Sequence, residues 1–428
     1  MPNAARVVNE IFERTGIPIA LVPTPEGRRF RVLQSQDLRF PLRIVHGGID
    51  GQGRPLIGGL GLIDQTMFEE ICRHDVWSFQ PTPIYDYDGY RRELVTEYRR
   101  LRPRGRVLAH LLLQTTWPYS GDSYFARVRR VHESHPNGIL HGTDGREWAV
   151  NLGEPTIVSG LVQLWSELLR SGVFDGAVLD GMPETMGWME ESFGPVDWAR
   201  AGYSSFAELE ARNRDGMFAI ANALRGLFPK AILIGNSGPR GPALLNGWWR
   251  ENFPAQNGGS WFTNMLEAWG RPMGLLNDRF RYSAPQLSVL SAAARPEFLL
   301  GSACLADAAA AYAPKDFNNQ TLYPVSWRAP GATIDRGSGA PDDRAVGWLG
   351  RAQGPARQVA GSPCWRRDFV FGSVVVNPSG ADVTVQYERP GFIAGGTTAR
   401  PTTEYPFENA PHPSVWVQAE GATFVLWE

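Results

Sequence analysis

Carboxylates at the ends of apolar segments are the residues best placed for catalysis. Asp180 ends the apolar segment 176–179 and precedes Gly181, where the chain must bend. In a parallel α/β barrel, the loops that follow the strands line the open face and carry the catalytic groups. Asp180 is therefore our first catalytic candidate, although an aspartate there also suits an Asx turn. Asp175 precedes the same segment in an Asp-Gly pair, which predicts a turn at the opposite, stabilising face of a barrel.

Cleavage of a glycosidic bond needs two carboxyl groups, one acting as acid and the other as nucleophile or base. Glu251 follows a predicted strand that contains two tryptophans, and it is our second catalytic candidate. The alternative is a salt bridge between Glu251 and Arg250 or another arginine. Glu267 lies in a helical context and is a weaker candidate. Glu184, in the loop after the first candidate, could face the same cleft or cap the helix that follows.

Several polar and aromatic residues fall where a neutral ligand would bind. Indole rings stack on the C–H faces of sugars while polar groups bind the hydroxyls, and the chain has 15 Trp, many in loop-like contexts. His110 lies in the middle of a predicted strand, so we interpret it as a core histidine. The predicted substrate-binding residues are Glu184, Asn236, His46, Gln114, Trp117, Trp188, Trp248, Trp249 and Trp261.

Other kinds of site find no support in the sequence. The three cysteines, Cys72, Cys304 and Cys364, form no C-x-x-C pair, there is no G-x-S-x-G motif, and the histidines are scattered. We therefore expect neither a metal nor a cofactor. Lys plus Arg number 42 against 44 Asp plus Glu, without a basic block, so we expect no nucleic-acid or membrane partner. Residues 1–6 lack the pattern of a secretory signal, which predicts a cytoplasmic protein or a particle component released by another route.

From residue 42 onwards, apolar segments alternate with amphipathic helical patterns. Such an alternation predicts a parallel sheet covered by helices, and hence an α/β fold. A (β/α)8 TIM barrel is the predicted architecture, with an open doubly wound sheet as the alternative. An eighth strand is hard to place, because 298–311 has a helical pattern before a short strand candidate at 312–314. The other predicted strands are 42–46, 76–79, 107–113, 176–179, 231–236, 248–252 and 273–277, and the predicted helices include 90–101, 157–169 and 206–227.

Changes in composition and hydrophobic pattern divide the chain into three parts. Residues 1–41 form an N-terminal extension with one helical pattern at 4–15. Residues 42–330 make up the barrel. Residues 331–428 are a Gly- and Pro-rich linker and a small C-terminal antiparallel β-sandwich. Its predicted strands are 368–377, 382–387, 414–418 and 422–427.

Four segments together resemble a known family. The segment 174–181, with 232–236, 246–254 and 365–378, is similar to glycoside-hydrolase-like family fifteen over roughly residues 42–390. This resemblance implies an eightfold α/β barrel, a small C-terminal β domain and carbohydrate as the substrate. The family tends to place Gly after the aspartate at Asp307, where this chain has Ala308.

The segment 174–181 also resembles the chitinase signature, which has a Glu two positions after its last aspartate. Met182 stands at that position here, so the proton donor of a chitinase is missing from its place. The combination of Asp180 and Glu251 is similar to families whose catalytic carboxylates follow the fourth and sixth strands. That resemblance implies that Asp180 is a nucleophile or electrostatic stabiliser and Glu251 the general acid/base, with its pKa raised by the neighbouring tryptophans.

Two functions follow as hypotheses. The first is a glycoside hydrolase that cleaves a polysaccharide. The second is a carbohydrate-binding or structural barrel without turnover, in a larger assembly such as a phage tail, with the N-terminal extension as a contact for protein partners. The position of the two carboxylates relative to each other distinguishes these hypotheses.

Overall fold

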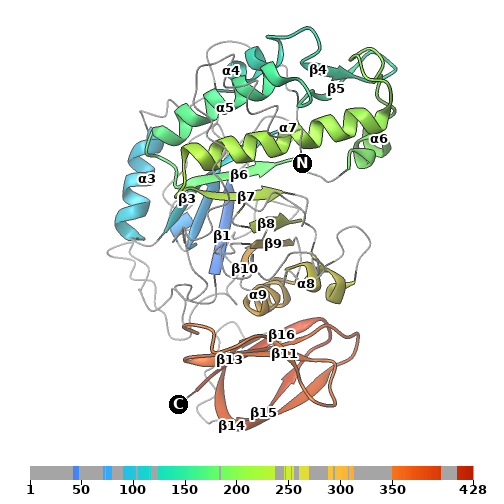
Figure 1. Ribbon diagram of the computed structural model, residues 1–428. Coiled ribbons are helices and arrows are strands. Elements are labelled where there is room, and N and C mark those ends of the chain that lie inside the picture. Colours follow the sequence, from blue (N-terminus) through green and yellow to red (C-terminus); the bar gives the residue numbers. More distant parts are fainter. Residues whose placement is uncertain are drawn as a thin grey trace.

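An eight-stranded parallel barrel forms the centre of the computed structural model (Figure 1). The residues that the structure describes are 42–47, 71–72, 74–79, 90–102, 105–114, 116, 124–182, 185–236, 245, 247–251, 253–254, 260–268, 288–292, 295–306, 308–312, 349–396 and 412–427. The barrel closes in the order β1-β10-β9-β8-β7-β6-β3-β2. Its strands are β1 (Leu42–Gly47), β2 (Val76–Phe79), β3 (Arg106–Leu112), β6 (Gly176–Asp180), β7 (Ile232–Asn236), β8 (Gly247–Arg250), β9 (Ser288–Ala292) and β10 (Ala308–Tyr312).

Helices pack on the outside of the strands, and the closure of the eight strands confirms the predicted α/β barrel and excludes the open sheet. The longest, α7, begins where the Ser205 hydroxyl accepts a hydrogen bond from the backbone N–H of Glu208. Pro155 opens α5, because a proline has no N–H to leave unsatisfied at a first helical position. The helices are α3 (Tyr90–Leu101), α4 (Tyr124–His132), α5 (Pro155–Arg170), α6 (Gly187–Phe193), α7 (Phe206–Leu227), α8 (Trp261–Ala268) and α9 (Pro296–Leu305).

Alternation along the strands decides which side chains enter the barrel. Val178 on β6, Ile234 on β7 and Trp249 on β8 belong to one buried cluster inside the barrel. Their sequence neighbours Leu179 and Leu233 belong to a second cluster, under the helices. Because successive side chains of a strand point to opposite faces, residues two positions beyond the inward ones also face inward. This periodicity directs the residues that follow β6, β7 and β8 toward one opening.

The eighth strand corrects one prediction. The helical pattern assigned to 298–311 ends with α9 at Leu305, and Ala308–Tyr312 is a strand between β9 and β1. Its four alanines favour a helix in isolation. Pairing on both edges and complete burial in the barrel wall override that preference. The seventh strand is Ser288–Ala292, whereas the predicted strand at 273–277 lies outside the described residues.

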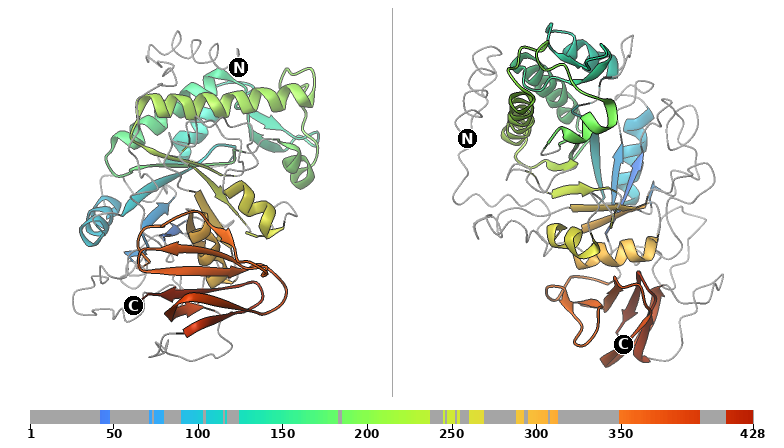
Figure 2. Two further views of the ribbon diagram at one scale, coloured as in Figure 1. Left: turned by 60° about the horizontal axis from the view of Figure 1, so that its bottom comes forward. Right: turned by 90° about the vertical axis from the view of Figure 1, so that its right-hand side faces the viewer.

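A six-stranded antiparallel sheet follows the barrel, where the sequence predicts a β-sandwich. Its order is β11-β12-β13-β16-β14-β15, and α9 lies between this sheet and the barrel (Figures 1 and 2). The predicted strand 368–377 is two strands joined by a turn at Val370 and Phe371. The strands are β11 (Arg357–Gln358), β12 (Trp365–Phe369), β13 (Gly372–Asn377), β14 (Val383–Gly396), β15 (His412–Val417) and β16 (Gly421–Leu426). The predicted boundary at 330 and the helix at 4–15 lie outside the described residues.

Two additions to the alternating pattern lie on the C-terminal side of the barrel. A hairpin of β4 (Ile139–His141) and β5 (Glu147–Val150) is inserted between β3 and β6, and α6 is inserted between β6 and α7. Figure 1 shows both near the end toward which the arrow of β6 points. Among the described residues, no helix is long and apolar enough to cross a membrane.

Candidate functional site

The candidate site lies where three neighbouring barrel strands end. Asp180 is the last residue of β6, Asn236 is the last residue of β7, and Glu251 directly follows β8. These are the fourth, fifth and sixth strands of the barrel in chain order. Gly181 follows Asp180 with φ +75°, a left-handed conformation in which a side chain would be strained. The strand therefore bends away directly after its carboxylate.

One amide joins the two carboxylates. The Nδ2 atom of Asn236 donates hydrogen bonds to Asp180 Oδ1 at 2.5 Å and to Glu251 Oε1 at 3.0 Å. A primary amide has two N–H groups, so a single nitrogen can serve both acceptors. The predicted candidates Asp180, Glu251 and Asn236 are thus gathered at one point of the barrel opening. The Asn236 side chain is buried, whereas Glu251 is exposed.

His110 is a site residue that the sequence interpretation missed. Its Nε2 lies 3.0 Å from Asp180 Oδ2, and its side chain is 8% exposed against 28% for the aspartate. A carboxylate only accepts hydrogen bonds, so Nε2 carries the proton in this contact. His110 is on β3 and pairs with Val178 on the neighbouring strand β6. Val178 is the inward-facing residue two positions before Asp180, the last residue of β6. His110 follows the inward-facing Leu108 by two residues, and side chains two apart on a strand face the same side. This spacing was the signal in the sequence that predicts an inward-facing histidine.

Of the two tryptophans of β8, Trp249 packs against the site from inside the barrel. The Trp249 ring lies edge-on to His110, with ring centroids 6.4 Å apart at 83°. Trp249 is 5% exposed and Trp248 is 7% exposed. Both were predicted to bind substrate, but the burial of Trp249 in the barrel core gives it a packing role against His110.

Three other predicted substrate-binding residues have surroundings other than the two carboxylates, although Gln114 lies beside Gly181, whose Cβ would come 3.5 Å from the Gln114 Cβ. The Gln114 amide nitrogen is 3.6 Å from the Met217 sulfur on α7 and is buried there. Trp261 is buried against Trp365 of the C-terminal sheet, and its Nε1 donates to the Ser302 hydroxyl on α9. Trp188 is on α6, where it is 44% exposed.

The remaining candidates lie outside what the structure describes. Glu184, Trp117 and Asp307 are not among the described residues. His46 is in β1 and Glu267 is in α8, but only their backbone is described.

Asp175 has the structural place that its sequence context predicts. Its Oδ2 accepts hydrogen bonds from the Val107 backbone N–H at 2.8 Å and from the Arg99 guanidinium at 3.2 Å. These contacts join the start of β6 to β3 and α3, at the barrel end opposite Asp180. The aspartates at the two ends of one strand therefore have different surroundings.

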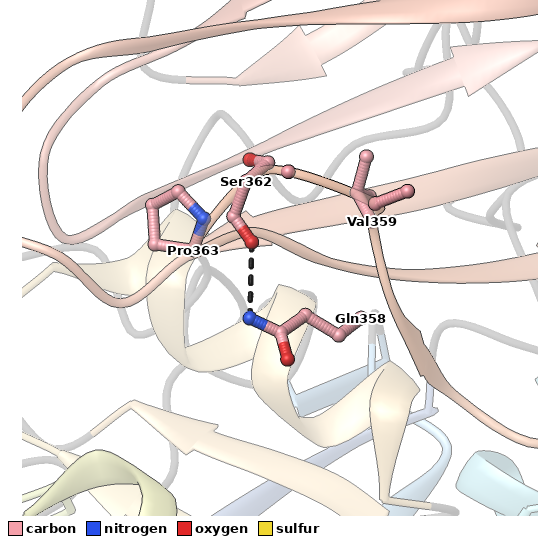
Figure 3. Close-up of a pocket in the computed structure, with 6 residues that line it drawn as sticks. Gln358, Val359, Ser362 and Pro363 are labelled. Carbon is pink, nitrogen blue, oxygen red and sulfur yellow. Dashed lines mark hydrogen bonds between the residues drawn. The ribbon is translucent and has the colours of Figure 1, made fainter.

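Other parts of the described chain offer weaker chemistry. No group of three or more His, Cys, Asp or Glu side chains is placed to hold a metal ion within the described ranges. A hollow of about 520 Å³ lies on the C-terminal sheet and is lined by residues 358–363 (Figure 3). The Gln358 amide donates to the Ser362 carbonyl there at 3.0 Å. These six consecutive residues contain no acid or base for general acid–base catalysis.

Comparisons with known proteins find only remote likeness. No family model and no curated protein matches the sequence. Among solved structures, Eubacterium rectale Amy13B aligns at 10% identity and TM-score 0.46, covering 94% of this chain and 100% of that one. Trehalose-6-phosphate hydrolase from Bacillus licheniformis aligns at 10% identity and TM-score 0.46, covering 90% of this chain and 99% of that one. The alpha-amylase from Geobacillus thermoleovorans aligns at 11% identity and TM-score 0.42, covering 94% of this chain and 100% of that one. At these values, the case for any function rests on the site geometry.

Proposed function

We propose that this protein is a glycoside hydrolase that cleaves a polysaccharide with Asp180 and Glu251. The observation that carries the proposal is the Asn236 amide, which donates to both carboxylates at the open end of the barrel. Two carboxyl groups across a small gap are the machinery of glycosidic cleavage. A barrel without turnover has no need to bring two acids together, since like charges at short range repel.

The shared amide limits the distance between the two carboxylates. Hydrogen bonds of 2.5 and 3.0 Å to one nitrogen leave Asp180 Oδ1 and Glu251 Oε1 no more than about 5.5 Å apart. Carboxyl groups about 5–5.5 Å apart indicate retention of anomeric configuration, whereas about 6.5–9.5 Å leaves room for the water of inversion. This bound applies to one oxygen of each carboxyl group, and it favours the closer, retaining arrangement, which we include in the proposal.

The two acids differ in their surroundings and hence in their roles. Asp180 has a donor on each oxygen, Asn236 on Oδ1 and His110 on Oδ2, which orients it as the nucleophile. Glu251 is exposed, and Asn236 contacts its Oε1, so Oε2 is the oxygen that would carry a proton. These contacts support Glu251 as the general acid and base.

The reaction then proceeds in two balanced steps. Glu251 gives its proton to the glycosidic oxygen as Asp180 attacks the anomeric carbon, so the C–O bond breaks and a glycosyl–Asp180 ester forms. Glu251 next takes a proton from water, whose oxygen displaces Asp180. The second step thus returns both carboxyl groups to their starting states.

The experiment measures the reducing ends that the full chain releases from a panel of polysaccharides. For each polysaccharide that is cleaved, the anomer formed first is then identified. Asp180→Asn is expected to abolish cleavage while leaving the thermal unfolding temperature close to that of the wild type. Asp144→Asn is the matched control, because Asp144 is an exposed carboxylate on the β4–β5 turn that pairs with Arg146. Full activity in Asp180→Asn would remove this residue from the mechanism. A wild-type chain that binds polysaccharide but cleaves none would favour the non-catalytic barrel.

Glu251→Gln separates the two roles. Loss of the general acid is expected to slow cleavage of natural glycosides by about 100-fold or more. Aryl glycosides with good leaving groups need little protonation, so the first step on them should survive and release a burst of the aryl alcohol. Equal loss on both substrates would contradict the acid role of Glu251.

A further inference from the structure

Two exposed aromatic side chains stand together on the short helix α6. Trp188 is 44% exposed and Phe193 is 55% exposed, with their ring centroids 6.3 Å apart. Five large apolar side chains are exposed among the described residues, and two of the five are on this seven-residue helix. Scattered single apolar residues on a surface are ordinary, whereas an adjacent pair on one short element is less so.

The helix that carries them is firmly attached to the rest of the protein. Its inner side buries Met186 and Met189 in a cluster with Trp148. The backbone N–H of Met186 donates to the Glu210 carboxylate of α7 at 2.6 Å, and the Trp148 Nε1 donates to the Gly194 carbonyl at 2.9 Å. The two exposed rings are therefore presented by a fixed support, which lowers the entropy cost of binding through them.

The segment between β6 and α6 joins this helix to the candidate site. It leaves β6 directly after Asp180 and reaches α6 at Gly187, so the aromatic pair follows the proposed nucleophile in the chain. Figure 1 shows α6 on the side toward which β6 points, which is the open end of the barrel. In this architecture the loops after the strands determine which substrate is bound.

We infer that Trp188 and Phe193 form a distal sugar-binding subsite, which makes the enzyme selective for long glycan chains. This inference rests on the proposed glycosidase function. A tryptophan face suits a sugar ring, and Glu191 and Ser192 between the two aromatics are exposed and able to bind its hydroxyls. On this proposal, a long chain reaches both this pair and the carboxylates, whereas a short substrate held at the carboxylates alone gains nothing from the subsite.

The test compares long and short substrates in the full chain. Trp188→Ala is expected to raise KM for the polysaccharide by about two- to tenfold, the range that corresponds to the loss of one ring-stacking contact. Its kcat on the polysaccharide, and both constants on a two-sugar aryl glycoside, are expected to stay at the wild-type values. Phe193→Ala should have the same effect in a smaller measure.

A matched control comes from the C-terminal sheet. Phe371, on the turn between β12 and β13, is 57% exposed, close to the 55% of Phe193. Phe371→Ala therefore removes a phenyl ring of similar exposure to the one removed in Phe193→Ala. An equal KM effect in Phe371→Ala, or equal losses on long and short substrates in Trp188→Ala, would overturn the subsite.

A binding experiment separates failure of the subsite from failure of the proposed function. Retardation of Asp180→Asn in gels that contain the polysaccharide requires no turnover, and adding Trp188→Ala should weaken that retardation. Unchanged retardation in the double variant would also overturn the subsite. A protein that cleaves none of the panel fails as a glycosidase, whatever the gels show.

Discussion

At the scale of single residues, the site depends on donors that hold one carboxylate from two sides. Asn236 fixes Oδ1 of Asp180 and His110 fixes Oδ2, and both donors are buried. An ion surrounded by fixed donors needs little reorganisation when its charge changes during a reaction. The acid role proposed for Glu251 has a different requirement, because a general acid must exchange its proton with substrate and water. Its exposure fits that requirement.

Removal of the imidazole tests its positioning role. His110→Ala is expected to lower kcat by about 10- to 100-fold with little change in KM, because Asp180 loses a donor but the sugar contacts remain. His110→Gln can still donate an N–H, so it should recover part of the activity. The measurement is steady-state kinetics on the best polysaccharide from the panel. Equal KM and kcat effects, or no rescue by glutamine, would show that the histidine only fills space.

At the scale of elements, periodicity predicted most of the fold. The helices Tyr90–Leu101 and Phe206–Leu227 have the predicted bounds, because their amphipathic faces and flanking polar residues are local signals. The strand at Ala308–Tyr312 could not be found that way, since alanine favours a helix and only barrel closure makes it a strand. His110 was missed for a related reason. A mid-strand histidine becomes a site residue only when the neighbouring strand ends beside it.

The helix α4 ends in a buried histidine that should make stability depend on pH. Burial, with Arg129 nearby, lowers the pKa of His132 to about 4 from 6.5. Neither of its ring nitrogens has a hydrogen-bond partner among the described residues, so the neutral form is the one that fits. The unfolded chain therefore binds this proton at a higher pH than the folded chain does. The stability that His132 contributes is present above pH 6.5 and is lost as the pH falls from 6.5 toward 4.

Urea unfolding at pH 7.0, 5.5 and 4.5 measures this effect. His132→Leu removes the titrating group. Between pH 7.0 and 4.5, the free energy of unfolding should therefore decrease less in this variant than in the wild type, by roughly 3 kcal/mol at most. His135→Gln is the control, because His135 is partly exposed and lies 3.7 Å from Glu154. Parallel pH profiles for His132→Leu and the wild type would refute the assignment.

At the scale of the whole molecule, α9 makes the barrel and the C-terminal sheet one packed body. The helix is fully buried from Phe298 to Leu305. A Cβ at Gly301 would come 2.5 Å from the Ala422 Cβ of β16, so the absence of a side chain lets the sheet approach the helix. The apolar cluster of the barrel interior continues through α9 into Val374, Val376 and Phe424 of the sheet. We therefore expect the two parts to unfold together.

A buried arginine is the polar link across the same interface. Arg367 of β12 is 7% exposed, and its Nη1 donates to the Cys304 carbonyl at the end of α9 at 2.9 Å, while its Nε donates to the Gly354 carbonyl at 2.8 Å. In Arg367→Ala the carbonyl of the buried Cys304 loses this donor, whereas the exposed Gly354 can turn its carbonyl to water.

We expect Arg367→Ala to lower the free energy of unfolding by at least about 2 kcal/mol, because hydrogen bonds from a charged group are strong and the carbonyl of the buried Cys304 cannot reach water easily. Arg357→Ala is the matched control: its guanidinium pairs with Asp368 at 2.9 Å but is 67% exposed, so its loss should cost less than about 1 kcal/mol. Urea unfolding followed by tryptophan fluorescence reports both parts, since the barrel and the sheet each contain Trp. A two-step transition in Arg367→Ala would mean that this arginine is what couples the sheet to α9. Equal, small losses in both variants would instead assign the coupling to the apolar packing around Gly301.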